Sequence, residues 1–172
     1  MKKNIFLALD FNSLDRALEV VSQTKDYLAG IKIGLELYSV LGLKGLKEFE
    51  QFKLPIFLDT KIFDIPNQVV KTIKIISEFK SIKYFTIHSL GSLEMLKAAQ
   101  KTAEGTNLEF LAVSILTSWN KKDLEYIGIN NNVDDQVKLL VKLACQAKLS
   151  GVIASAQDIP LTRQISKEIK IF

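Results

Sequence analysis

The chain has 172 residues, 48% of them hydrophobic and 24% charged, which is typical of one globular domain and excludes a disordered or fibrous protein. The formal net charge is +4, but the 23 basic residues are interspersed with 19 acidic ones without a block of like charge, which argues against nucleic-acid binding. No run approaches the roughly 18–20 apolar residues that a membrane-spanning helix needs, so we expect a soluble protein without a membrane partner.

A single cysteine, Cys145, excludes an intrachain disulfide. It stands beside Leu143 and Ala144 in a stretch of helical period, so we interpret it as a small core residue of a protein from a reducing compartment. The apolar run at the start of the chain ends at Asp10, too early for a signal peptide. We therefore expect a cytoplasmic protein.

Short apolar runs predict strands, and stretches of helical period between them predict helices. The predicted strands cover residues 4–9, 30–34, 55–59, 83–88, 109–115 and 151–155, and a seventh begins at 170–172. The clearest predicted helix faces are Leu14, Ala17, Leu18, Val21 and Leu28, then Val69, Val70, Ile73 and Ile76, and then Val137, Leu140, Val141 and Ala144. Ser13 and Ser92 are expected N-caps, Pro66 suits a first helical turn, and two glycines weaken the helix expected around Gly42 and Gly45.

Regular alternation of apolar strands and helices predicts a parallel sheet that is buried on both sides. Two architectures fit this pattern, a doubly wound open sheet and an eight-stranded barrel. No glycine-rich dinucleotide motif follows the first strand, which ends Leu9-Asp10-Phe11-Asn12, so the barrel is favoured. We predict an α/β fold of the TIM (β/α)8 type in a single domain, residues 1–172. Because a full barrel has about 250 residues, we expect it to be truncated after about six β/α units.

Polar residues follow the carboxyl ends of successive predicted strands, where a parallel barrel places its chemistry. They are Asp10, Lys32, Asp59 with Lys61, His88, and Thr117 with Ser118. Each has a simpler explanation alone: Asp10 can cap a turn, Lys32 can extend to solvent, and His88 can be a hydrogen-bonded core histidine. Their common position predicts one site.

The third predicted strand contributes the densest group of charges, Asp59, Lys61 and Asp64. Residues i and i+2 of an extended strand face the same side, so Asp59 and Lys61 are expected to point together. With Asp64 they are expected to share a small volume. The D-x-K-x-x-D pattern alone is a weak signal, because strand-to-helix corners are usually solvated.

Taken together, these segments resemble the orotidine 5′-phosphate decarboxylase family. The similarity runs in order through Leu7–Asp10, Ile31–Gly34, Leu58–Asn67, Ile87–Ser89, Val113–Ser118 and Gly151–Ser155. It covers essentially the whole chain, and the D-x-K-x-x-D-I-P string with a Lys-x-Gly strand upstream is specific.

The resemblance implies decarboxylation of orotidine 5′-phosphate to UMP in pyrimidine biosynthesis, without a metal or other cofactor. Lys61 would donate a proton to C6 of the pyrimidine, and Asp59 would lie against the substrate carboxylate. Asp64 would enter the site of a neighbouring subunit in a homodimer. The substrate-binding residues implied are Asp10 and Lys32 at the ribose, Thr117 near the pyrimidine, and Ile65 and Gln68 after the charged group.

Gln68 departs from the family pattern, in which a threonine usually helps to bind the ribose. The resemblance also assigns phosphate binding to a later Pro-Gly turn with an arginine, a glutamine in a flexible loop and a Gly-Arg pair, which have no counterpart in the 172 residues. Two hypotheses follow: a decarboxylase that is incomplete or completed by another polypeptide, and a non-catalytic barrel fragment that acts as a folding or dimerisation unit. A magnesium-dependent sugar-phosphate enzyme with the same strand end ranks lower, because Lys32 replaces an acidic metal ligand.

Overall fold

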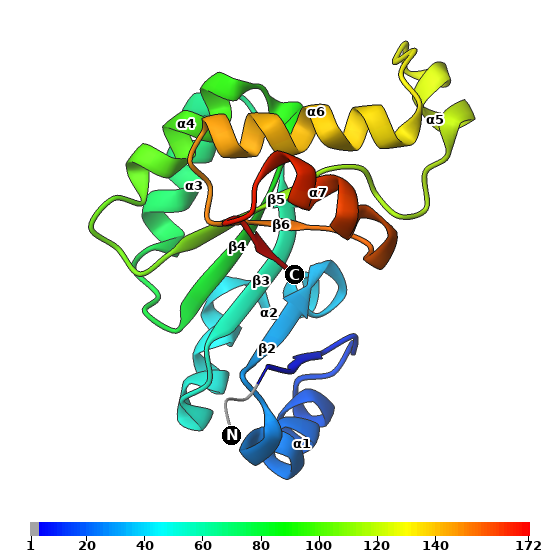
Figure 1. Cartoon of the computed structure of the whole chain (residues 1–172). Coiled ribbons are helices and arrows are strands. Elements are labelled where there is room, and N and C mark those ends of the chain that lie inside the picture. Colours follow the sequence, from blue (N-terminus) through cyan, green and yellow to red (C-terminus); the bar gives the residue numbers. More distant parts are fainter. Residues whose placement is uncertain (1–3) are drawn as a thin grey trace.

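Seven parallel strands form a single sheet in the computed structural model, which describes residues 4–172. The strands are β1 (Phe6–Ala8), β2 (Gly30–Gly34), β3 (Ile56–Ile62), β4 (Ile82–His88), β5 (Glu109–Val113), β6 (Gly151–Ile153) and β7 (Lys170–Ile171). Each strand pairs with the next in the chain, and the sheet curls into an incomplete barrel with helices on its outside (Figure 1). The predicted barrel-type α/β fold is confirmed.

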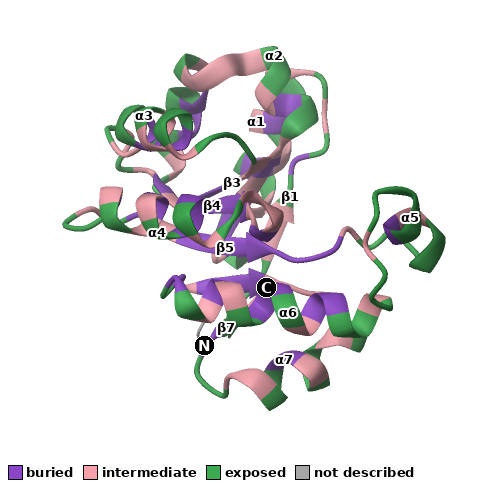
Figure 2. Cartoon of the chain, turned by 90° about the horizontal axis from the view of Figure 1, so that it is seen from above, coloured by how far each residue is buried: buried purple, intermediate pink, exposed green. Residues whose placement is uncertain are grey.

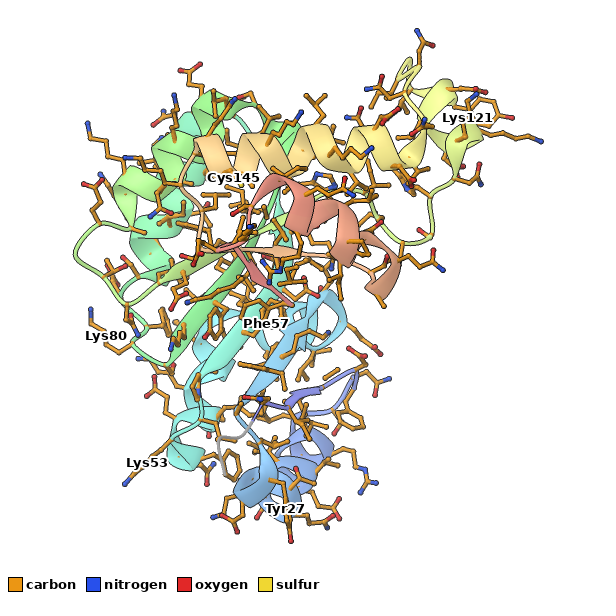
Figure 3. All side chains as sticks on the ribbon, viewed as in Figure 1. Tyr27, Lys53, Phe57, Lys80, Lys121 and Cys145 are labelled. Atoms are coloured by element: carbon orange, nitrogen blue, oxygen red, sulfur yellow. The ribbon has the colours of Figure 1, made fainter. Side chains whose placement is uncertain are left out.

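Within the described residues, seven α-helices connect and follow the strands. They are α1 (Leu14–Thr24), α2 (Leu35–Gly45), α3 (Pro66–Ile76), α4 (Leu93–Thr102), α5 (Lys121–Tyr126), α6 (Val133–Gln146) and α7 (Ile159–Ile165). Short 3-10 segments cover Lys25–Tyr27, Leu46–Phe52, Ser89–Gly91 and Ala156–Asp158. The short helix α5 projects from the body of the molecule, and Lys121 lies at its outer end (Figures 1 and 3).

The expected helix ends are found where a local signal marked them. Ser13 accepts a hydrogen bond from the Arg16 amide, Ser92 accepts one from the Met95 amide, and Pro66 is the first residue of α3. One expectation needs correction: the first helical face was predicted too long, because α1 ends at Thr24 and Leu28 is buried beyond it. The weakness expected of the helix around Gly42 and Gly45 is confirmed, because Gly42 has φ 58°, which interrupts the helical geometry of α2.

The core fills the space between the strands and the helices around them. The first three residues of β3, four of the seven residues of β4 and the last four residues of β5 are buried, as Figure 2 shows for β5. On α3 the buried side chains are Val69, Ile73 and Ile76, which repeat at helical spacing and face the sheet. Apolar strands with covered faces on both sides are what a parallel sheet requires.

Aromatic side chains pack inside the barrel near the amino ends of the strands. Phe172, which follows β7, lies 6.0 Å from the ring centroid of Phe6, 6.0 Å from Phe57 and 4.9 Å from Tyr84. Phe57 is at the centre of the molecule, close to the end of the chain (Figure 3). The curled sheet therefore brings β1 and β7 near each other, although within residues 4–172 β1 pairs only with β2 and β7 only with β6.

Among the helices of the described residues, none could span a lipid bilayer.

Two isoleucines on α3 test this packing. Ile73 is fully buried, whereas Ile75 is 54% exposed. We expect Ile73→Ala to lower the free energy of unfolding by about 2–4 kcal/mol, because it removes buried methyl groups and leaves a cavity. Ile75→Ala should change it by no more than about 0.5 kcal/mol. Denaturant titration of both variants checks this, and equal losses would contradict the assigned helix face.

Candidate active site

The carboxyl end of β3 brings Asp59 and Lys61 together. Lys61 Nζ donates to Asp59 Oδ1 across 2.9 Å. The Asp59 side chain is 15% exposed and that of Lys61 is 33% exposed, so both charges lie partly out of solvent. The predicted contact between these two side chains is present.

A second ammonium extends this pair into a row of alternating charges. Lys32, on β2, lies with Nζ 3.8 Å from Asp59 Oδ2 and 3.5 Å from Asp10 Oδ1. Asp10 follows β1 and is the most exposed of the four, at 70%. Polar residues after β1, on β2 and on β3 thus meet on one side of the sheet, as their positions at the strand ends predicted. The order is Asp10, Lys32, Asp59 and Lys61.

The backbone at Lys61 does not follow a regular strand. Its φ is 51°, in the left-handed region that costs a side-chain-bearing residue on the order of 1–2 kcal/mol. The pairing of β3 with β4 also shifts register between Leu58 and Ile62. Strand alternation correctly predicted that Asp59 and Lys61 point together. The contact is nevertheless made at a bulge, which changes the direction of the Lys61 side chain relative to a regular strand.

Thr86 on β4 is a site residue that the sequence reasoning missed. Its hydroxyl accepts a hydrogen bond from the Lys61 amide at 2.8 Å and donates to Asp59 Oδ1 at 3.1 Å. The residue is completely buried. The available signal was a hydroxyl inside an apolar strand, two residues before His88.

Asp64, in the corner after β3, is not part of the row of paired charges. Its carboxylate is exposed and accepts a hydrogen bond from the Ile65 amide at 2.7 Å, and within residues 4–172 it forms no ion pair. The structure therefore pairs Asp59 with Lys61 but pairs Asp64 with neither of them among the described residues, and the place of Asp64 in the site stays a prediction. The chain turns outward after β3 into α3, leaving Phe63 and Ile65 beside it 62% and 64% exposed.

The remaining predicted substrate-binding residues are exposed, and among residues 4–172 their side chains form no hydrogen bond with Asp10, Lys32, Asp59 or Lys61. Gln68 lies in the first turn of α3, where its backbone N–H donates a hydrogen bond to the Ile65 carbonyl. Thr117 and Ser118 lie in the loop after β5. Thr117 lines a cavity of about 720 Å³, a size suited to a small ligand, whose walls come from the loops after β5 and β6 and the start of α6. Neither Asp59 nor Lys61 lines it.

His88, at the end of β4, is partly buried beside the charged row. Its Nδ1 accepts a hydrogen bond from the Leu90 amide at 3.3 Å, and its ring centroid is 6.0 Å from that of Phe63. Burial, and secondarily the positive charge of Lys61, lower the pKa of His88 below 6.5. The ring is therefore neutral at pH 7 and its Nδ1 is satisfied, as in the simpler interpretation of a hydrogen-bonded core histidine.

The part of the chain that the structure describes contains no cluster of three His, Cys, Asp or Glu side chains arranged to hold a metal ion. The two carboxylates in the row, Asp10 and Asp59, instead face the ammonium of Lys32. The arrangement is suited to holding cations of the protein next to a group that becomes negative during a reaction.

Comparison with known proteins shows to which family the chain belongs. A family model described as "Orotidine 5′-phosphate decarboxylase / HUMPS family" matches residues 3–172. The chain belongs to this family. It is 37% identical over 164 residues to orotidine 5′-phosphate decarboxylase of Sphingopyxis alaskensis, covering 95% of this chain and 72% of that protein. The corresponding Wolbachia pipientis subsp. Culex pipiens enzyme is 35% identical over 168 residues, covering 97% of this chain and 74% of the relative.

A solved structure extends the family match to the fold. Orotidine 5′-phosphate decarboxylase from Lactobacillus acidophilus superposes with a TM-score of 0.86 at 27% identity, covering 99% of this chain and 80% of that one. The incomplete barrel of Figure 1 therefore follows the family fold over nearly its whole length. The named relatives are decarboxylases, which are carbon–carbon lyases of pyrimidine biosynthesis.

His88 provides a pH test of the site, since it is the only histidine in the chain. Its pKa is lowered in the folded state, so the unfolded chain binds a proton first as the pH falls. The free energy of unfolding should therefore decrease as the pH drops below about 6.5, until folded His88 is also protonated. His88→Asn removes this titration and keeps an acceptor for the Leu90 amide, so its unfolding free energy should fall less between about pH 7.5 and 5.5. Denaturant titrations at several pH values check this, and equal pH dependence in both proteins would contradict it.

Proposed function

We propose that this site decarboxylates orotidine 5′-phosphate to UMP, with Lys61 as proton donor. The observation that carries the proposal is the Lys61 ammonium held 2.9 Å from Asp59, with Lys32 on the other side of the same carboxylate. Membership of the decarboxylase family supports the substrate and the reaction class.

The chemistry requires a cation where charge develops. The bond between C6 and the carboxylate breaks, carbon dioxide leaves, and the electron pair stays on C6, which then takes a proton from the Lys61 ammonium. A cation at that atom interacts more strongly with the transition state than with the substrate, which is the condition for acceleration. Asp59, 2.9 Å from the Lys61 ammonium, restricts its position before the reaction. Solvent can return the proton to the lysine afterwards.

We infer that the other predicted residues bind the substrate. Asp10 and Lys32 have the polar groups to bind ribose hydroxyls, and Thr117 lies in the loop expected to meet the pyrimidine. Ile65 and Gln68 would contribute from the start of α3, where a glutamine amide can supply both a donor and an acceptor.

The free thiol of Cys145 supports a cytoplasmic location.

We infer further that two chains form a homodimer with shared sites. Asp64 is exposed between Phe63 and Ile65, two large apolar side chains that are also exposed. Phe63 and Ile65 also line a hollow of about 490 Å³ with Leu90 and Gly91. An apolar surface around a carboxylate suits a second copy that buries it and receives the carboxylate near its own Lys61.

The alternatives are disfavoured to different degrees. A magnesium-dependent reaction would need carboxylates free to bind the ion, but Asp10 and Asp59 both face the Lys32 ammonium. A non-catalytic fragment that acts only in folding or dimerisation is the second candidate. It is favoured by the unpaired edges of β1 and β7 in the described part of the chain.

Lys61→Ala tests the catalytic role. If the proposal is correct, the intact 19.3 kDa chain converts orotidine 5′-phosphate to UMP at high enzyme and substrate concentration. Lys61→Ala should then lower turnover by on the order of 10³-fold or more, because it removes both the cation and the proton donor. Lys74→Ala, on the exposed face of α3, is the matched control and should retain full turnover.

Two results separate the candidates. Turnover of Lys61→Ala within tenfold of the parent would remove the assigned role. No decarboxylation by a purified chain of verified intact mass would instead favour the non-catalytic fragment.

Mixed dimers test the shared site. A chain with Asp64→Asn keeps Lys61, and a chain with Lys61→Ala keeps Asp64, so a mixed dimer would contain one intact site. After random exchange of subunits we expect recovery of about a quarter of the parental activity, because half of the dimers are mixed and each has one working site. The measurement is the activity of the co-refolded mixture of two tagged variants, followed by that of the isolated heterodimer, which should show about half of the parental activity because one of its two sites works.

The control mixes Asp64→Asn with a chain carrying both substitutions, which leaves no Asp64 in any dimer and should restore nothing. Lack of recovery in verified heterodimers of the two single variants would rule out the shared site.

A further inference from the structure

We propose that Thr86 is a positioning residue of the site, whose hydroxyl sets the geometry of Lys61 and Asp59 together. The proposal rests on the decarboxylase function proposed above for its kinetic consequences, but the geometry on which it depends is independent of any substrate. Thr86 is not expected to touch the substrate, and it acts through the two charged residues.

The register of the sheet explains why a side chain is needed here. Leu58 pairs with Phe85 and Ile62 pairs with Ile87, so residues 59–61 of β3 lie opposite Thr86 alone. A regular ladder of backbone hydrogen bonds cannot pair the N–H and C=O groups of these three residues with those of a single residue on β4. The Thr86 hydroxyl accepts the Lys61 N–H at 2.8 Å and so takes the place of a main-chain acceptor.

The same hydroxyl also orients the Asp59 carboxylate. The hydroxyl oxygen uses a lone pair to accept from the Lys61 amide, so its single proton remains free to donate to Asp59 Oδ1, 3.1 Å away. That carboxylate oxygen also accepts from Lys61 Nζ. One hydroxyl therefore contacts the lysine at its backbone and the aspartate at the oxygen that holds the lysine's ammonium.

Burial makes these two hydrogen bonds specific. Thr86 is completely buried, between the apolar neighbours Phe85 and Ile87, so water is not available to replace either bond. Lys61 also has a left-handed backbone, which needs support from its surroundings to persist. Loss of the hydroxyl should therefore let both Lys61 and Asp59 move, while the packing of β4 is kept by any side chain of the same shape.

Three substitutions separate positioning from packing. Thr86→Val keeps the shape and removes the hydroxyl, and Thr86→Ser keeps the hydroxyl and removes a methyl group. Thr162→Val is the matched control on α7, because Thr162 is also completely buried and its hydroxyl has no hydrogen-bond partner among the described residues.

The first measurement is steady-state kinetics on orotidine 5′-phosphate. We expect Thr86→Val to lower kcat by about 10- to 100-fold with KM changed less than about threefold, because a small displacement of a reacting group costs rate more than binding. Thr86→Ser should retain kcat within about fivefold, and Thr162→Val should match the parent. Parental kcat in Thr86→Val, or an equal loss of kcat in Thr86→Ser, would overturn the proposal.

The second measurement does not depend on activity. Amide hydrogen exchange should become at least about tenfold faster at Lys61 in Thr86→Val, and remain near the parental rate in Thr86→Ser and Thr162→Val. Unchanged exchange at Lys61 in a folded Thr86→Val would overturn the positioning role. If the parent chain has no decarboxylase activity, the proposed function fails, while this exchange comparison still decides whether Thr86 holds the lysine.

Discussion

The Asp59 carboxylate is the group around which the carboxyl side of the barrel is arranged. It is only 15% exposed, and a carboxylate removed from water must be compensated by cations and hydrogen-bond donors. Lys61, Lys32 and the Thr86 hydroxyl supply this compensation from three different strands. Each of these strands is held in register by the sheet, so the positions of the two ammonium groups follow from strand pairing as well as from their attraction to Asp59. The fold therefore preorganises the charges before any substrate binds.

Much of the architecture could be predicted because it depends on signals local to the chain. The apolar runs of the six complete strands and the start of a seventh correspond to β1–β7, with differences of a few residues at their ends. The N-caps at Ser13 and Ser92 and the helix start at Pro66 were also readable, because each depends on one residue and its immediate neighbours. Their positions at strand ends were enough to predict that Asp10, Lys32, Asp59 and Lys61 meet, since parallel strands end on the same side.

What could not be predicted depends on pairing between strands. The bulge at residues 59–61 arises from the register of β3 against β4, which strand periodicity does not contain. Thr86 was missed for the same reason: a threonine is common in strands, and only the register places its hydroxyl under Lys61. Asp64 was expected beside Asp59 and Lys61 because of its closeness in the chain, but it follows β3 in the corner before α3, where it is exposed and where closeness in the chain does not determine the direction of a side chain.

The position of the charged row within the sheet determines how firmly each member is held. β1 is an edge strand in the described structure and pairs with β2 over three residues, so Asp10 follows a strand with a neighbour on one side only. Asp59 and Lys61 lie on β3, between β2 and β4: Asp59 pairs with Gly34 of β2, and the Thr86 hydroxyl of β4 bonds to both residues. The difference in exposure, 70% for Asp10 against 15% for Asp59, agrees with this. The geometry of the reacting pair is therefore set by β2, β3 and β4 and does not require β1 and β7 to be joined, whereas the placement of Asp10 is sensitive to whatever pairs with the free edge of β1.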